Sequence, residues 1–132
     1  MNGVDIIGHL LRGDAALTAI WPAAPIKAGA LAEGELGILV RSVSVIDWQP
    51  LAAEPMVHST ERVAVTVRAK TYREQVAAIK LIRRACASVI AAEIGEARGI
   101  AVLTAGTGPD VVGPGNTFEQ AQDFRVSFTA PA

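Results

Sequence analysis

Cysteine, histidine and aromatic residues are all scarce in this sequence. Its 132 residues include one cysteine, Cys86, and two histidines, His9 and His58, and aromatic residues make up 5%. A single cysteine cannot form an internal disulfide, and so few thiols and imidazoles cannot supply a Cys/His zinc cluster. The composition therefore gives no indication of a disulfide-stabilised secreted domain or of a zinc-binding domain.

An excess of charge and long apolar runs are also missing. The chain has 12 Lys and Arg residues and 13 Asp and Glu residues, which gives a net charge of -1. Nucleic-acid-binding domains usually carry a strong basic excess, so we expect no sequence-specific nucleic-acid partner. No stretch approaches the ~20 apolar residues that cross a bilayer, and the first residues lack the pattern of a signal peptide. We expect a soluble protein, made in the cytoplasm, with no membrane partner.

Small aliphatic residues, by contrast, are abundant. Hydrophobic residues make up 51% of the chain, mostly Ala, Val, Ile and Leu, and they suffice for a tightly packed core. The length is that of one ordinary domain, so residues 1–132 are expected to form a single domain. Because large aromatic anchors are few, part of the apolar surface is a candidate for burial against other subunits.

Two short helices and two strands are predicted in the first half of the chain. Residues 3–12 space their apolar side chains along one helical face, and Asp14 can cap a further turn over 15–20. Residues 36–48 are expected to be a strand. Its apolar residues fall on one face in the first half and on the other face in the second half, and a β-bulge would bring both sets onto the same face. Residues 62–70 alternate apolar and polar side chains, as a half-buried antiparallel strand does.

The strongest helical pattern covers residues 71–94. Thr71 and Glu74 have the spacing of a capping box at its start, and Gly95 or Gly99 is expected to end it. Apolar residues follow at helical spacing, and they are Ile79, Ile82, Cys86, Val89 and Ile90. This stripe predicts a helix that packs its apolar side onto a sheet.

Two strands are expected in the last third of the chain, over residues 100–104 and 118–128. The predicted fold is therefore α+β: an antiparallel or mixed β-sheet with an N-terminal helix and one long helix, residues 71–94, packed on the sheet. The expected core comprises the inward-facing residues of these elements: Val63, Val65, Val67, Ile79, Ile82, Cys86, Val89, Phe124 and Val126.

Glycine and proline interrupt the chain most densely between residues 105 and 117. Gly106 and Gly108 match the first two glycines of a dinucleotide-binding fingerprint, but Val111 stands at the third position. The prolines disfavour the helix that would hold the phosphates, and no P-loop lysine follows. The pattern favours a mobile connection between strands, as does the proline-bearing stretch over 49–60. The residues that mark this candidate loop are Gly106, Gly108, Pro109, Gly113 and Gly115.

Residues of catalytic type are scattered. Cys86 lies on the apolar stripe of the predicted helix, where a buried thiol behaves as a small hydrophobe rather than as a nucleophile. The carboxylates have no spacing that is typical of an acid/base or metal-binding pair. We therefore expect no enzymatic activity, no catalytic residue, no bound metal and no cofactor.

The order of elements resembles the tail terminator, or tail completion, proteins of long-tailed bacteriophages and phage-derived gene transfer agents. Three phrases carry the resemblance: "LRGDAALTAI" at the end of the opening helix, "RVAVTVRAKTYREQVAAIKLIRRA" from a strand into the long helix, and "AQDFRVSFTA" in the last strand. The resemblance covers most of the chain. The middle strand, "LGILVRSV", lacks the aromatic residues that many members carry there.

The resemblance implies a non-enzymatic structural protein of a virion tail or gene transfer agent particle, assembled in the host cytoplasm. Such proteins form a hexameric ring at the head-proximal end of the tail tube, stop tube polymerisation and provide the head–tail joining surface. The implied partners are further copies of the chain, the major tail tube protein and a head–tail connector protein. In such a ring the glycine-rich stretch would belong to the assembly apparatus.

Opposite charges on separate elements are candidates for a subunit or tube interface. The candidate residues are Arg73, Lys80 and Arg84 on the predicted long helix, with Glu119 and Asp123 on the outward side of the last strand. A ring uses a heterologous interface, in which complementary charges set the register; otherwise the basic residues form a solvated face. Two further alternatives stay open: another head–tail connector or minor tail protein, and a small-ligand or nucleotide-binding domain.

Overall fold

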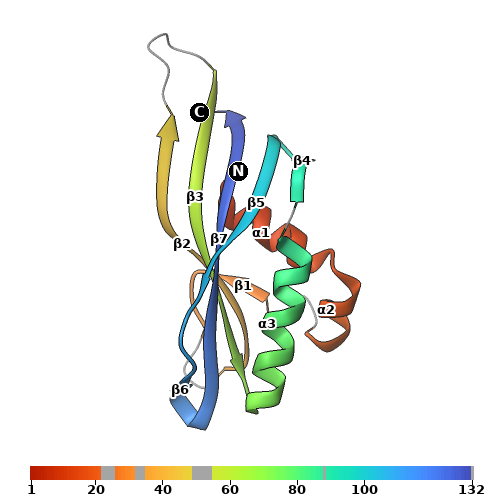
Figure 1. Cartoon of the computed structure of the whole chain (residues 1–132), viewed down its shortest axis with the longest axis vertical. Helices are drawn as coiled ribbons and strands as arrows, with labels where there is room; N and C mark the ends of the chain where they lie inside the picture. Colours follow the sequence, from red (N-terminus) through yellow and green to blue (C-terminus); the bar gives the residue numbers. More distant parts are fainter. Residues whose placement is uncertain (22–25, 32–34, 49–54, 88, 132) are drawn as a thin grey trace.

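The computed structural model describes residues 1–21, 26–31, 35–48, 55–87 and 89–131. In chain order, their elements are α1 (Gly3–Arg12), α2 (Ala15–Ile20), β1 (Ile26–Ala28), β2 (Gly37–Trp48), β3 (Met56–Ala69), α3 (Tyr72–Cys86), β4 (Val89–Ile94), β5 (Ala97–Thr107), β6 (Val111–Gly113), the 3-10 helix η1 (Pro114–Asn116) and β7 (Thr117–Pro131). The strands form one curled sheet in the order β1-β2-β3-β7-β5-β4, with β6 also paired to β7 (Figure 1). β1 runs parallel to β2 and the other pairs are antiparallel, which confirms an α+β fold with a mixed sheet.

The first two helices begin at side chains that cap them. Asn2 accepts a hydrogen bond from the Asp5 amide, and the Asp5 carboxylate accepts one from the Asn2 amide. The Asp14 carboxylate accepts a hydrogen bond from the Ala16 amide at the start of α2. These bonds satisfy amides that have no partner within a helix. Both predicted helices, with the predicted Asp14 cap, are confirmed.

Three long antiparallel strands, β2, β3 and β7, form the middle of the sheet. β3 pairs with β7 along its whole length without a register shift, whereas β2 shifts its register on β3 between Ser42 and Ser44. The shift places Val45 on the same face as Ile38 and Val40, because all three lie opposite residues of the inward face of β3. The β-bulge predicted in the first long strand is therefore confirmed.

Two predicted strands are longer than the sequence indicated. β3 already begins at Met56, so the second half of the stretch predicted as a loop over 49–60 is strand; residues 49–54 lie outside the described residues. β5 extends from Ala97 to Thr107, beyond the predicted 100–104. In both cases a neighbouring strand supplies hydrogen bonds that the local sequence does not reveal.

The helix predicted over 71–94 is wrong in its C-terminal part. Thr71 caps its start, since its hydroxyl accepts a hydrogen bond from the Glu74 amide, but among the described residues the Glu74 side chain does not complete the predicted capping box. The helix nevertheless ends at Cys86, and Ala87 already has extended backbone angles (φ -68°, ψ 146°). α3 is therefore a helix of 15 residues rather than the single long helix that the apolar spacing predicted.

The remainder of that stretch forms β4 instead. Val89 and Ile90 are β-branched residues that favour strands, and β4 has β5 to pair with. Gly95, with φ +56°, lies in the turn between β4 and β5, and Gly99 lies within β5. Neither glycine therefore ends a helix. Pairing with β5 at the edge of the sheet outweighed the helical spacing of the apolar residues.

The core lies between one face of the sheet and the helices α1 and α3, which run along that face (Figure 1). Eight of the nine predicted core residues are buried: Val63, Val65, Val67, Ile79, Ile82, Cys86, Phe124 and Val126. Val89 is only partly buried because it lies on β4 at the edge of the sheet. The alternating strand patterns therefore identified the inward face correctly.

Candidate interaction surfaces

The strand segment Arg41–Trp48, here called the β2 edge segment, projects beyond the part of the sheet that the helices cover (Figure 1). One side of it pairs with β3. On its other side β1 reaches only as far as the pair Ala28–Val40, and no other described strand pairs with it. All of its residues are exposed, so both its faces and its outer edge are open among the described residues.

The β2 edge segment has exposed apolar side chains on both of its faces. Val43, Val45, Ile46 and Trp48 are each between 50% and 59% exposed. Val45 lies on the core side of the sheet, and Ile46 and Trp48 lie on the opposite side. A long exposed apolar edge is a template for pairing with another chain. Sequence reasoning found this strand but not its exposure, although apolar residues on both faces were a signal for it.

A groove, here called the acidic groove, opens beside this segment at the start of α1. Its lining includes Met1, Val45, Asp47, Val57, Glu61 and Phe128. Glu61 is only 1% exposed; its Oε1 accepts a hydrogen bond of 2.9 Å from the Gly3 amide, and its Oε2 has no partner among the described residues. A Cβ at position 3 would lie 2.8 Å from the Glu61 Cδ, so any residue other than glycine there would force the Glu61 side chain to shift.

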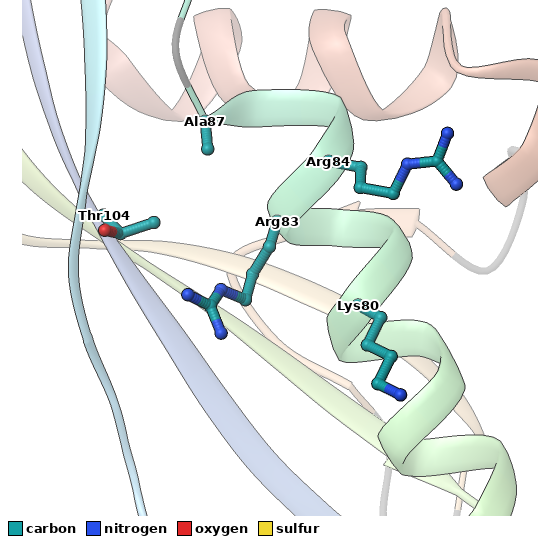
Figure 2. A pocket seen from close by; sticks show the side chains of 5 residues that line it. All are labelled: Lys80, Arg83, Arg84, Ala87 and Thr104. Atoms are coloured by element: carbon teal, nitrogen blue, oxygen red, sulfur yellow. The ribbon is translucent and has the colours of Figure 1, made fainter.

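The predicted basic residues of the long helix, Arg73, Lys80 and Arg84, all lie exposed on α3, together with Arg83. None of these four cations has a hydrogen-bond acceptor or ion pair among the described residues. Lys80, Arg83 and Arg84 line a shallow depression with Ala87 and with Thr104 of β5. In Figure 2 the Arg83 side chain extends toward β5, whereas those of Lys80 and Arg84 extend away from it.

The predicted acidic residues, Glu119 and Asp123, lie on the outward face of β7, as expected, but they bind arginines of the same chain. The Arg68 Nε donates to the Glu119 carboxylate at 2.6 Å, and the Arg62 Nε donates to the Asp123 carboxylate at 2.9 Å. These cross-strand pairs between β3 and β7 lie on the face of the sheet opposite to α3. The structure therefore does not bring the predicted acidic and basic residues together within one copy.

The glycine-rich stretch forms part of the sheet instead of the irregular connection that was predicted. Gly106 lies in β5, Gly108 and Pro109 lie in the short link to β6, Gly113 ends β6, and Gly115 lies in η1 with φ +70°. β6 pairs with the start of β7. Within the described part of the chain, the only helix that follows is η1, with three residues, so the helix N-terminus of a dinucleotide-binding fingerprint does not follow these glycines.

Glutamine side chains hold this stretch in place. Gln120 donates to the Gly108 carbonyl at 2.9 Å, and Gln122 donates to the Gly106 carbonyl at 3.1 Å. Gln75 of α3 donates to the Asp110 carboxylate at 2.7 Å, where the Tyr72 hydroxyl also donates. Sequence reasoning missed these anchors, although glutamines at alternating positions among phenylalanines of the last strand were a signal for them.

The residues that could have supported catalysis are separated. Cys86 is fully buried, and burial, with a smaller contribution from Asp14, raises its pKa from 9.0 to about 12. A thiol that keeps its proton at neutral pH is a poor nucleophile. His9 is exposed on α1, and His58 lies beside the Thr129 hydroxyl. Among the described residues, no three His, Cys, Asp or Glu side chains gather as a metal site would require, and no helix is long and apolar enough to cross a membrane.

Comparison with known proteins finds no family model that matches the chain and no curated protein that matches it. Among the described residues, the features that stand out are the exposed apolar edge of β2, the acidic groove and the unpaired cations of α3. All three are surface features suited to contacts with other macromolecules.

Proposed function

We propose that this chain is a structural protein of the tail terminator type, one copy of a ring that caps the head-proximal end of a tail tube. The ring would stop tube polymerisation and present the surface to which the head joins. The observation that carries the proposal is the β2 edge segment, which is exposed, has apolar side chains on both faces and is without a strand partner on its outer side among the described residues.

Such an edge is a liability for a protein that works as a monomer. Natural monomers protect their sheet edges with charged residues, prolines, bulges or covering elements. The β2 edge segment has a bulge between Ser42 and Ser44, but beyond it, up to Trp48, the strand has a single charged residue, Asp47, and no proline. A closed ring would cover the edge in every copy by placing it against a neighbour, since a heterologous interface repeats around the ring.

The two ends of the sheet differ, as a ring between two different partners requires. Figure 1 places the glycine-rich stretch with β6 at one end of the sheet and the tip of the β2 edge segment at the other. One end therefore offers backbone held by glutamines, and the other offers apolar strand. We propose that these ends serve contacts with the tail tube and with the head–tail connector.

The test is a capping assay with purified tail tubes, read by electron microscopy, together with the mass of the protein in solution. The wild type should form rings and end tubes at a defined length. Ile46→Lys should remain folded by circular dichroism and fail to cap. Ile20→Lys is the matched control, because Ile20 is 56% exposed on α2 and Ile46 is 57% exposed; it should cap normally. Capping by Ile46→Lys would refute a role for the β2 edge segment.

The basic side of α3 is tested by the double charge reversal Lys80→Glu and Arg84→Glu. The variant should stay folded, because both side chains are exposed and unpaired among the described residues, and tubes grown with it should be overlong or headless. Normal capping would show that these cations form only a solvated face. A wild type that binds a connector but ignores tubes would instead indicate another head–tail connector protein.

A further inference from the structure

The two carboxylates of the acidic groove have no cationic partner among the described residues. Asp47 accepts a hydrogen bond from the Ser59 hydroxyl at 2.5 Å, and Glu61 accepts one from the Gly3 amide. The start of α1 offsets part of the Glu61 charge through its helix dipole. A buried carboxylate with one free oxygen still calls for a positive charge nearby.

The shape of the acidic groove suits a long cationic side chain. Val45, Val57 and Phe128 supply apolar walls, and Asp47 and Glu61 supply negative charge. Its volume of about 350 Å³ equals that of about a dozen liquid waters. Arg and Lys side chains have the matching form, because an apolar stem carries the charged group.

The same chain carries the complementary group on another element. Lys80, Arg83 and Arg84 lie exposed within one turn of α3 and have no acceptor among the described residues. They do not contact the acidic groove of their own copy, whose lining contains no residue of α3. Each surface thus offers the charge that the other lacks.

We propose that the acidic groove of one copy binds the Lys80–Arg84 turn of α3 from a second copy, with Arg84 paired to Asp47. This inference rests on the proposed function, since it names the contact between neighbouring copies in the ring. Arginine is suited to the role because its planar guanidinium can bind a carboxylate through two hydrogen bonds. Glu61 strengthens the attraction from the base of the groove. The two surfaces differ, so copies join head to tail, as a ring requires.

Charge reversal followed by restoration tests the pairing. Asp47→Arg alone and Arg84→Asp alone should each weaken self-association about a hundredfold, because a cross-interface attraction becomes a repulsion. A 1:1 mixture of these two variants should regain the wild-type mass, because contacts of the wild-type kind alternate around the ring with charge-swapped contacts. Combining both substitutions in one chain should restore the wild-type mass. Light scattering after gel filtration measures each mass.

Two exposed residues outside the proposed contact provide controls with equal changes of charge. Glu93→Arg on β4 matches Asp47→Arg, and Arg125→Asp on β7 matches Arg84→Asp. Both should keep the wild-type mass. A second measurement uses the chain with Asp47→Cys and Arg84→Cys, which should form a ladder of cross-linked multimers with a thiol-specific bismaleimide whose spacer spans the length of an arginine–aspartate pair, while the native Cys86 stays buried.

Three outcomes would overturn the inference: single reversals that keep the wild-type mass, a doubly substituted chain that stays dissociated, or no cross-linked ladder. A wild type that stays monomeric at millimolar concentration would also overturn it. The proposed function is judged separately by tube capping. If the reversal variants assemble and cap tubes normally, the ring stands and only this contact between copies is wrong.

Discussion

Alkaline pH should destabilise this protein through the thiol of Cys86. Burial raises the pKa of the folded-state thiol from 9.0 to about 12. Between these values the unfolded chain has lost the thiol proton and the folded chain still holds it, so the free energy of unfolding falls as the pH rises. The contribution of the protonated Cys86 thiol to the free energy of unfolding is complete below pH 9. It falls by about 1 kcal/mol per pH unit above pH 9 and is lost by pH 12.

Comparison with Cys86→Ala isolates this effect. At pH 7 the wild type should be more stable by about 1 kcal/mol, because the sulfur fills core space that alanine leaves empty. The difference should vanish near pH 10 and reverse above it, since alanine has no proton to lose. Ionisation of Tyr72 and of the lysines occurs in both proteins and cancels. Urea unfolding followed by circular dichroism at pH 7, 9, 10 and 11 measures the difference.

A stability difference that stays constant from pH 7 to 11 would refute this reasoning, because the thiol would then ionise equally in the folded and unfolded states. An independent measurement is the rate of alkylation by iodoacetamide. The native thiol should react at least a hundredfold more slowly than the thiol in urea, since its thiolate fraction is lower and it is buried.

Three further predictions follow from the packing and hydrogen bonds. Phe124→Ala should lower the free energy of unfolding by about 3–5 kcal/mol, because Phe124 is fully buried. Leu103→Ala, at an exposed position, should change it by less than about 0.5 kcal/mol. Urea denaturation measures both variants, and equal losses would contradict the assigned core. The Asp110 carboxylate raises the pKa of Tyr72, first through its hydrogen bond and then through its charge. Because Tyr72 is the only tyrosine, absorbance at 295 nm should show Asp110→Asn lowering this pKa, and an unchanged titration would argue against the contact. Thr71→Ala should cost about 1 kcal/mol by removing the α3 cap, seen as a lower urea midpoint.

Features with a local cause were predictable from the sequence. The starts of α2 and α3 follow from Asp14 and Thr71, whose side chains bond amides two or three residues away. The inward faces of β3 and β7 follow from strict alternation along each strand. The end of α3 was not predictable in this way, because residues beyond Cys86 keep a helical apolar spacing and become strand only through pairing with β5.

The candidate interaction surfaces were harder to predict from the sequence, because most of them are formed by contacts between distant segments. The exposure of the basic residues on α3 was predictable from helical spacing. The pairing of Glu119 and Asp123 with arginines of β3 depends on the register between two strands that are far apart in sequence. The acidic groove joins the start of α1 to β2, β3 and β7, so no local pattern contains it.

The central place of β7 also determines how the chain can reach its native state. β7 lies between β3 and β5, and its pairs with β3 join residues roughly fifty to seventy-five positions apart, from Ala69–Phe118 to Met56–Pro131. Pairings of such long range slow folding, typically to milliseconds or seconds. α3 and the hairpins β2–β3 and β4–β5 involve nearer residues and can form first. Until β7 inserts, β3 presents a second open apolar edge, so we expect refolding yield to fall as protein concentration rises.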